Sequence, residues 1–359
     1  MSVTTPRPPA APIAITQGDP AGIGGELIAK LYAADPAITA GCFVVGDADH
    51  LRRAAAVVTR PGQTPPPVLE IADPAQAWSA PAGHIPLLQV GPARPLVRWG
   101  QVQAEAGRLA ADAVTWAARA ALRGQVAALV TAPVHKEALA AAGVRFPGHT
   151  ELLQAQAAAH LGKTVSEVPV RMMLQSTALR TVLVSIHVSL REAIEAVTRE
   201  NVRETLRITH AALSAMLGRA PRIGVAGLNP HAGEGGLFGR EEIEAIAPAV
   251  ADARAQGLNV QGPLAPDTVF MRARARDGAP GEFDVVVAMY HDQGLIPVKY
   301  LGLDEGVNVT LGLPLVRTSP DHGTAFDIAG TGRADPASLA QAIRTARSLG
   351  ASMQRLESA

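Results

Sequence analysis

The sequence predicts an α/β protein built from parallel βαβ units. At 359 residues the chain exceeds the usual size of one domain, so we expect two domains or one large α/β unit with a cleft. Apolar residues make up 48% of the chain and aromatic residues only 3%, which is typical of aliphatic parallel strands covered by Ala-rich helices. Short apolar runs also alternate with longer segments whose apolar residues recur every three or four positions.

These patterns predict the elements in chain order. Strands are expected at residues 13–16, 42–45, 127–131, 180–186, 222–226 and 284–289. Helices are expected at residues 103–123, 191–216 and 240–256. The proline-rich segments 60–68 and 81–95 are predicted to be surface loops. Residues 1–12 lack the apolar core of a signal peptide and are predicted to form a disordered leader.

Charge and cysteine content narrow the class of protein. Lys plus Arg and Asp plus Glu number 32 each, with no basic stripe, so we expect no nucleic-acid partner. The single cysteine, Cys42, rules out an internal disulfide, fits a reducing compartment and is expected to be a small core residue. No apolar run reaches the roughly 18 residues of a membrane span. We therefore expect a cytoplasmic protein that does not bind membranes.

Three histidines stand directly after predicted strands. His187 follows the run 181–186, His231 follows 223–226 within GLNPHAGEGGLF, and His291 follows 284–290. Imidazole suits zinc, nickel, cobalt and similar ions, and three protein ligands leave coordination positions open for a substrate. The spacings are too long for a local zinc-finger loop, so the fold must assemble such a site. The alternative is that each histidine only hydrogen-bonds a neighbouring loop.

Two glycine-rich loops are candidates for nucleotide binding. Residues 16–26, TQGDPAGIGGE, join a strand to a helix, so a ligand can approach the backbone and an anion can reach helix N-terminal amides. The stretch is not GxGxxG, and a plain βα turn is the alternative. Residues 321–332, DHGTAFDIAGTG, can wrap an adenosine moiety, with Asp327 accepting ribose hydroxyls, although an ordinary loop is again possible.

Two polar clusters suit an anionic substrate. In FPGHTEL, residues 146–152, His149 and Thr150 can donate hydrogen bonds to an oxyanion. The apolar stretch 290–317 concentrates polar groups that need partners, and its lysine and arginine suit a phosphate or carboxylate. These groups are His291, Asp292, Lys299, Asn308 and Arg317. A structural ion-pair network is the competing interpretation.

In combination, GHTE, LNPHAGEGG, YHDQG and DHGTAFDIAG resemble the 4-hydroxythreonine-4-phosphate dehydrogenase family of vitamin B6 biosynthesis, over residues 13–339. The resemblance implies the isocitrate/isopropylmalate dehydrogenase-like fold, with two α/β/α domains and a cleft between them. Residues 13–130 with 310–359 would form the first domain, and residues 131–309 the second. That second domain would carry most metal and substrate residues and the interface of a homodimer.

The resemblance also implies the roles of individual residues. His187, His231 and His291 match the ligands of one divalent ion (Zn, Mg, Co, Ni or Mn), with His291 supplied by the other subunit. The implied substrate-binding residues are His149, Thr150, Lys299, Asn308 and Arg317. Lys299, Asp267 and Asp292 are the candidates for acid/base work, the two aspartates also for orienting a ligand imidazole. The positions implied for NAD or NADP are Gly18, Asp19, Gly22, Gly24, His322, Gly323, Thr324 and Asp327.

The family's reaction is the implied activity. It oxidises the secondary hydroxyl of 4-phosphohydroxy-L-threonine and then decarboxylates the product to 3-amino-2-oxopropyl phosphate. Alternatives are oxidation of D-threonate or D-erythronate 4-phosphate, or of an aromatic cis-dihydrodiol. A phosphometabolite-binding protein without catalysis and a metal-dependent hydrolase are candidates from other classes. The chain departs from the family pattern at Gln17 and Gly25, where proline is usual. Glycine in place of proline at position 25 is expected to loosen the turn.

Overall fold

The computed structural model describes residues 11–276, 278–302 and 306–357 of the chain. These residues divide into two compact units. Among them, unit 1 comprises residues 11–156, 322–336 and 346–357, and unit 2 comprises residues 157–276, 278–302, 306–321 and 337–345. The first ten residues of the expected leader lie outside the described part. No helix in the described part is long and apolar enough to cross a membrane.

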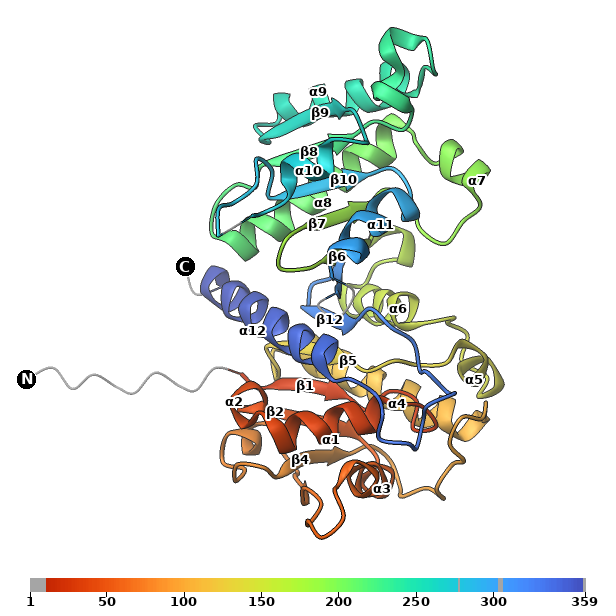
Figure 1. Cartoon of the computed structure of the whole chain (residues 1–359), viewed down its shortest axis with the longest axis vertical. Helices are drawn as coiled ribbons and strands as arrows, with labels where there is room; N and C mark the ends of the chain where they lie inside the picture. The colour runs from red at the N-terminus through yellow and green to blue at the C-terminus, as the bar shows by residue number, and fades with distance from the viewer. Residues whose placement is uncertain (1–10, 277, 303–305, 358–359) are drawn as a thin grey trace, which may run out of the picture. The chain divides into compact units, whose positions relative to one another are not determined.

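Unit 1 contains a parallel sheet with strand order β3-β4-β2-β1-β5 (Figure 1). Helices α1 and α3 pack together, and α4 packs on β1, β2 and β5. The strands are β1 (Ile13–Thr16), β2 (Cys42–Gly46), β3 (Val68–Glu70), β4 (Ile85–Gln89) and β5 (Ala128–Thr131). The helices are α1 (Gly24–Ala34), α2 (Pro36–Thr39), α3 (Ala48–Val58), η1 (Pro74–Trp78), α4 (Ala104–Leu122) and α5 (Lys136–Ala141).

The strand order of unit 1 reverses between β1 and β5, because the chain proceeds from β1 to β2 on one side and later places β5 on the other. In open α/β sheets, ligands bind outside the carboxyl ends of strands at such a reversal. The loops after β1 and β5 therefore border the expected ligand edge of unit 1. Every residue of β1, β2 and β5 is buried.

Unit 2 contains a mixed sheet with strand order β12-β11-β6-β7-β10-β8-β9. The β12-β11-β6-β7 pairs are antiparallel, and the β7-β10-β8-β9 pairs are parallel. The strands are β6 (Arg171–Gln175), β7 (Arg180–Leu183), β8 (Ile223–Ala226), β9 (Val260–Leu264), β10 (Val285–Ala288), β11 (Val307–Leu311) and β12 (Arg317–Pro320). The helices within it are η2 (Val165–Glu167), α7 (Leu190–Glu195), α8 (Arg199–Leu217), η3 (Pro230–Gly236), η4 (Glu242–Ile246), α9 (Ala247–Ala255), α10 (Val269–Ala273) and α11 (His291–Leu301).

Two helices contribute to both units. α6 (His149–Leu161) and α12 (Ala337–Glu357) each cross a unit boundary. The units also differ in extent from the expected domains 13–130 with 310–359 and 131–309. Residues 131–156 fall in unit 1, where α5 packs against α4. Residues 310–321 fall in unit 2 because β11 pairs along its length with β6.

Several predicted elements differ from the structure. The predicted helix 191–216 is two helices, α7 and α8, because the Thr198 side chain caps the second by accepting a hydrogen bond from the Asn201 amide. The predicted loop 81–95 contains β4, which pairs with β2 and β3. The antiparallel pairing through β6, β11 and β12 stands beside the predicted parallel units. The predicted strand at 13–16 and helix at 103–123 are confirmed as β1 and α4.

Candidate functional site

The three strand-end histidines follow neighbouring parallel strands of unit 2. β10 lies between β7 and β8, so the carboxyl ends of these strands share one edge of the sheet. His187 comes after β7, His231 after β8, and His291 begins α11 after β10. The rings of His187 and His291 lie with their centroids 5.5 Å apart. The expected gathering of histidines at one sheet edge is therefore present for this pair.

Carboxylates orient two of the three imidazoles. His291 Nδ1 lies 2.7 Å from Asp292 Oδ1, and His231 Nδ1 lies 3.0 Å from Glu234 Oε2. A metal-binding histidine commonly donates one ring N–H to a carboxylate, which fixes the ring and leaves the other nitrogen for the metal. The donor set therefore fits a divalent ion bound through Nε2.

Backbone strain is concentrated at these positions. His187 has φ of 39°, and His231 has φ of 53°. Residues 231–235 form a run of left-handed conformations, including the non-glycine residues Ala232 (φ 56°) and Glu234 (φ 43°). Left-handed conformations are costly for residues with a Cβ and tend to persist at functional sites, where the surroundings impose them. The loops that carry His187 and His231 thus have backbone conformations of the kind that is found at functional sites.

Side chains tie the three strand ends together. The Ser185 hydroxyl donates to the Met289 carbonyl at 2.9 Å, which joins the ends of β7 and β10. Gln293 accepts from the Met289 amide at 2.7 Å and donates to the Gly227 carbonyl at 2.8 Å, which joins the ends of β10 and β8. The loops that carry His187, His231 and His291 are consequently held in register by side-chain bonds.

A cavity of about 730 Å³ opens beside this edge of unit 2. His231, Asp267 and Asp292 are among its lining residues, together with the exposed side chains of Met271 and Ile296. The two aspartates were the sequence candidates for acid/base work, and the cavity brings them together with a candidate metal ligand. Asp292 also contacts the imidazole of His291, and its role in orienting a ligand imidazole stays a prediction.

Among the described residues, no three His, Cys, Asp or Glu side chains are grouped so as to hold a metal ion. The pair that meets is His187 with His291 of the same chain. The resemblance implied another grouping, in which His187 and His231 share a subunit and His291 comes from the other, and that grouping stays a prediction.

The hairpin of β11 and β12 positions two of the expected substrate residues. Thr310 is paired directly with Arg317, and Asn308 with Ser319, so Asn308 and Arg317 lie on one face of the sheet. Arg317 is 4% exposed, and its Nη1 donates to Thr310 Oγ1 at 3.1 Å. A buried guanidinium held in this way suits planar recognition of a phosphate or carboxylate.

Lys299 of α11 is paired with an acid that the sequence did not single out as its partner. Its Nζ lies 2.7 Å from Asp321 Oδ2. The Lys299 side chain is 39% exposed and that of Asp321 is 11% exposed. The carboxylate holds the ammonium group in place at the end of the candidate substrate cluster.

In unit 1, the turn after β1 is closely packed against the loop after β5. Gly18 has φ of 73°, and a Cβ there would lie 2.4 Å from the Pro133 carbonyl oxygen, so only glycine fits. Asp19 donates its amide to the same carbonyl and is fully buried. Burial raises the pKa of the Asp19 carboxyl to about 6, against the lowering effects of the Ala21 amide and the charge of His135.

The two glycine-rich loops, residues 16–26 and 321–332, contact each other in unit 1. The Ile23 amide donates to the Thr324 carbonyl at 3.1 Å, and a Cβ on Gly22 would lie 2.9 Å from Thr324 Cβ. Phe326 stacks on His135 of the loop after β5, with ring centroids 4.6 Å apart. Gly22 and Thr324, two of the predicted cofactor positions, therefore lie next to each other.

The remaining substrate candidates of unit 1 stand at a helix N-terminus. His149 and Thr150 begin α6, directly after Gly148. The first amides of a helix have no partner within the helix and favour an anion there. Binding of an oxyanion by the FPGHTEL segment stays a prediction.

Sequence reasoning missed two buried glutamates that hold the candidate loops. Glu26 of α1 accepts the Gly330 amide at 2.5 Å and the Gly332 amide at 2.7 Å, which anchors the end of the 321–332 loop. Glu242 likewise accepts the Leu228 and Asn229 amides and so anchors the loop that carries His231. For Glu26, the only local signal was a glutamate in an otherwise apolar setting. The amides that it binds lie 304 and 306 positions away along the chain, so the sequence around Glu26 does not reveal them.

The two positions that depart from the family pattern have local explanations. Gln17 Oε1 accepts the Asp47 amide at 2.8 Å, which ties the β1 loop to the turn after β2. A Cβ on Gly25 would lie 2.8 Å from Ala54 Cβ, so this glycine permits close packing of α1 on α3.

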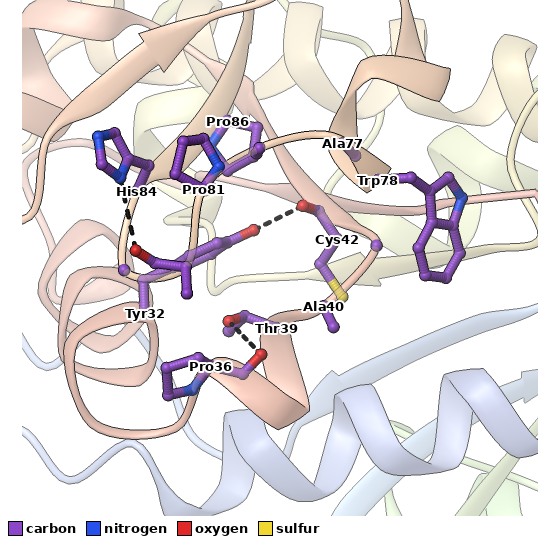
Figure 2. Close-up of a pocket in the computed structure, with 14 residues that line it drawn as sticks. Tyr32, Pro36, Thr39, Ala40, Cys42, Ala77, Trp78, Pro81, His84 and Pro86 are labelled. Carbon is purple, nitrogen blue, oxygen red and sulfur yellow. Dashed lines mark hydrogen bonds between the residues drawn. The ribbon is translucent and has the colours of Figure 1, made fainter.

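A smaller hollow of about 150 Å³ lies at the opposite edge of the unit 1 sheet, where β2 begins (Figure 2). Tyr32 and Trp78 line it, and the Tyr32 hydroxyl donates to the Cys42 carbonyl at 2.8 Å. Burial raises the pKa of the Cys42 thiol to about 11, so the thiol stays protonated at neutral pH. This agrees with the expectation that Cys42 is a small core residue.

Comparisons with known proteins agree on one family. The model of the pyridoxal phosphate biosynthetic protein PdxA family matches residues 39–346. The 4-hydroxythreonine-4-phosphate dehydrogenase of Beijerinckia indica is 49% identical over 92% of this chain and 93% of its own length. The D-threonate 4-phosphate dehydrogenase of Salmonella typhimurium is 45% identical over 94% of this chain and 98% of its own length. A crystal structure of 4-hydroxythreonine-4-phosphate dehydrogenase from Klebsiella pneumoniae superposes with a TM-score of 0.82 at 43% identity, covering 95% of this chain and 98% of that one.

Proposed function

Since the chain belongs to the family of pyridoxal phosphate biosynthetic protein PdxA, we propose that it oxidises 4-phosphohydroxy-L-threonine at the secondary hydroxyl and yields 3-amino-2-oxopropyl phosphate after decarboxylation. The chain is an oxidoreductase of the isocitrate/isopropylmalate dehydrogenase-like fold. The single observation that carries the proposal is the edge of unit 2, where His231, bonded to Glu234, lines a cavity together with Asp267 and Asp292.

The proposal assigns one divalent ion to His187, His231 and His291, and NAD or NADP to the paired glycine-rich loops of unit 1. The ion would supply Lewis acidity at the substrate hydroxyl, and the nicotinamide would supply an acceptor for hydride. The oriented imidazoles support this assignment, since Asp292 and Glu234 each hold one ring. The long spacings between the three histidines do not match the ligand spacing of a local structural zinc motif.

The chain's own residues would bind the substrate and manage its protons. Arg317 and Asn308, on one face of the β11–β12 hairpin, are suited to the phosphate and polar groups of the substrate. His149 and Thr150 at the start of α6 are assigned to the same task. Lys299, held by Asp321, is assigned to hold charge or pass a proton, and Asp267 or Asp292 to accept one.

A second substrate class is favoured by one specific finding. A relative that is 45% identical over 94% of this chain is named for D-threonate 4-phosphate. Both substrates carry a phosphate and a secondary hydroxyl next to an acid-bearing carbon chain, so the same residues suit either. Steady-state rates with 4-phosphohydroxy-L-threonine, D-threonate 4-phosphate and D-erythronate 4-phosphate, followed by reduced-cofactor absorbance, would decide between them. A preference of at least about tenfold for either sugar-acid phosphate would overturn the proposed substrate.

We also assign a cytoplasmic homodimer with the active site at the subunit interface. Two exposed apolar side chains line the unit 2 cavity, Met271 at 61% and Ile296 at 62% exposure. Apolar surface next to a functional cavity favours burial by a partner chain. A partner would also bring a third histidine to the pair formed by His187 and His291.

The metal assignment is tested by replacing His231. His231→Ala is expected to abolish turnover and to lower bound metal while the circular dichroism spectrum stays native, because one of three ligands is lost. His160→Ala, at an exposed position in the last turn of α6, is the matched control and should retain both properties. A His231→Ala protein that remains active with a full complement of metal would refute the ligand assignment.

A further inference from the structure

Glu242 is a carboxylate buried beneath the loop that carries His231. Glu242 is only 3% exposed. Oε1 accepts the Leu228 amide at 2.7 Å and the Asn229 amide at 2.8 Å, and Oε2 accepts from Asn229 Nδ2 at 3.0 Å. A single carboxylate thus satisfies three donors immediately before His231. Bonds of this kind to a charged acceptor are among the stronger ones in a protein interior.

The loop is shaped around this carboxylate. A Cβ on Gly227 would lie 3.1 Å from Oε1, and a Cβ on Gly233 would lie 2.7 Å from Oε2. Gly233 also has φ of 80°, within the left-handed run that includes His231. The glycines on both sides of His231 therefore leave room for the Glu242 side chain, and the loop closes over it.

The element that carries Glu242 is unusual as well. Glu242 opens η4, a π-helical turn that continues into α9. π-helical turns are rare and are frequent at functional sites, where they shift a side chain relative to a regular helix. Here the turn presents Glu242 to the end of β8, where the amides of Leu228 and Asn229 point inward.

We propose that Glu242 is a positioning residue for the metal site, which holds the left-handed loop so that the His231 imidazole is presented for ligation. The proposal rests on the proposed function, because it takes His231 as a ligand. Glu242 does not touch the ligand positions itself. It fixes the backbone at residues 228 and 229, and Glu234 then orients the ring of His231 from the other side. Groups of this kind behind a metal ligand typically contribute about 10- to 100-fold to metal affinity.

The test compares metal affinity among folded variants. Glu242→Ala removes all three bonds and is expected to weaken the binding of Zn²⁺ or Co²⁺ at least about tenfold in calorimetric titrations of metal-stripped protein. Glu242→Gln keeps one oxygen for the two amides but sets an NH2 group against Asn229 Nδ2, so a loss of about threefold is expected, between wild type and Glu242→Ala. Glu244→Gln is the matched control, because that exposed carboxylate bonds only to Arg240 among the contacts described, and it should bind metal as wild type does.

The outcomes separate the two proposals. Wild-type protein that binds no metal, or His231→Ala that binds it unchanged, refutes the proposed metal site itself. If wild type binds metal and His231→Ala loses it, while Glu242→Ala and Glu242→Gln both bind as wild type, the positioning role of Glu242 is refuted. Should Glu242→Ala fail to fold, Glu242→Gln decides alone, and wild-type affinity in that variant refutes the role. A graded loss in the order wild type, Glu242→Gln, Glu242→Ala supports it.

Discussion

Asp19 shows how burial in the candidate cofactor turn changes the chemistry of a single residue. Its carboxyl is fully buried, and burial raises its pKa to about 6. In the unfolded chain an aspartate loses its proton near pH 3.9. Between these values the unfolded state is ionised while the folded state keeps its proton, so the stability of the fold must fall as pH rises through this window.

Asp19→Asn is therefore expected to remove a pH dependence. The difference in unfolding free energy, wild type minus Asp19→Asn, should decrease by about 1 kcal/mol from pH 5 to pH 7 and change little above that range. Urea unfolding of both proteins, followed by circular dichroism, gives this difference, and the contributions of all other titrating groups cancel in it. A difference that stays level from pH 5 to pH 7 would show that the folded state does not hold this proton.

At the scale of elements, the packing of α1 on α3 depends on Gly25. A Cβ at this position would lie 2.8 Å from Ala54 Cβ, closer than two methyl groups can approach. Gly25→Ala is expected to destabilise the protein by about 1 kcal/mol, since overpacking outweighs the gain in helix propensity. Ala54→Gly should cost a similar amount, about 1 kcal/mol, through lower helix propensity.

The double variant provides the control for this prediction. Gly25→Ala with Ala54→Gly moves the methyl group from one helix to the other and removes the clash. The double variant should be more stable than the sum of the single effects predicts, with a coupling of about 1 kcal/mol in denaturant titrations. Strict additivity would mean that the helices shift apart without strain, and that Gly25 has no packing role.

Some elements of the fold could be predicted from the sequence and others could not. β1, β5 and β8 are continuous aliphatic runs that end at glycine or at turn residues, so their local pattern sufficed. β4 was hidden because Pro86 and the surrounding turn residues resemble a loop, while pairing with β2 and β3 outweighs that preference. The break between α7 and α8 depends on the cap at Thr198, which a helical apolar period does not reveal.

The candidate site divides along the same line. His187, His231 and His291 were predictable because each stands next to a recognisable strand, and a strand end is a local property. Glu26 and Glu242 were not, because each acts on backbone amides of a loop that is brought to it only by the fold. A buried carboxylate reveals its role only when its donors are known.

At the scale of the whole molecule, the metal-site proposal makes the subunits interdependent. His187 and His291 of one chain meet, whereas no third ligand joins them within the described residues of that chain. If His231 comes from the partner subunit of a closed dimer, each site draws two histidines from one chain and one from the other. Inactive variants can then restore each other when they are combined in one dimer.

Co-expression of differently tagged inactive variants therefore tests which chain supplies which histidine. In a dimer of one His187→Ala chain and one His231→Ala chain, both defects fall in the same site and the other site is intact, so a random mixture should recover about a quarter of wild-type activity. His187→Ala combined with His291→Ala should recover none, because each site then lacks one histidine of the pair. The reverse result would place His187 with His231 on one subunit and assign His291 to the partner, and no recovery in either mixture would place all three ligands on one chain.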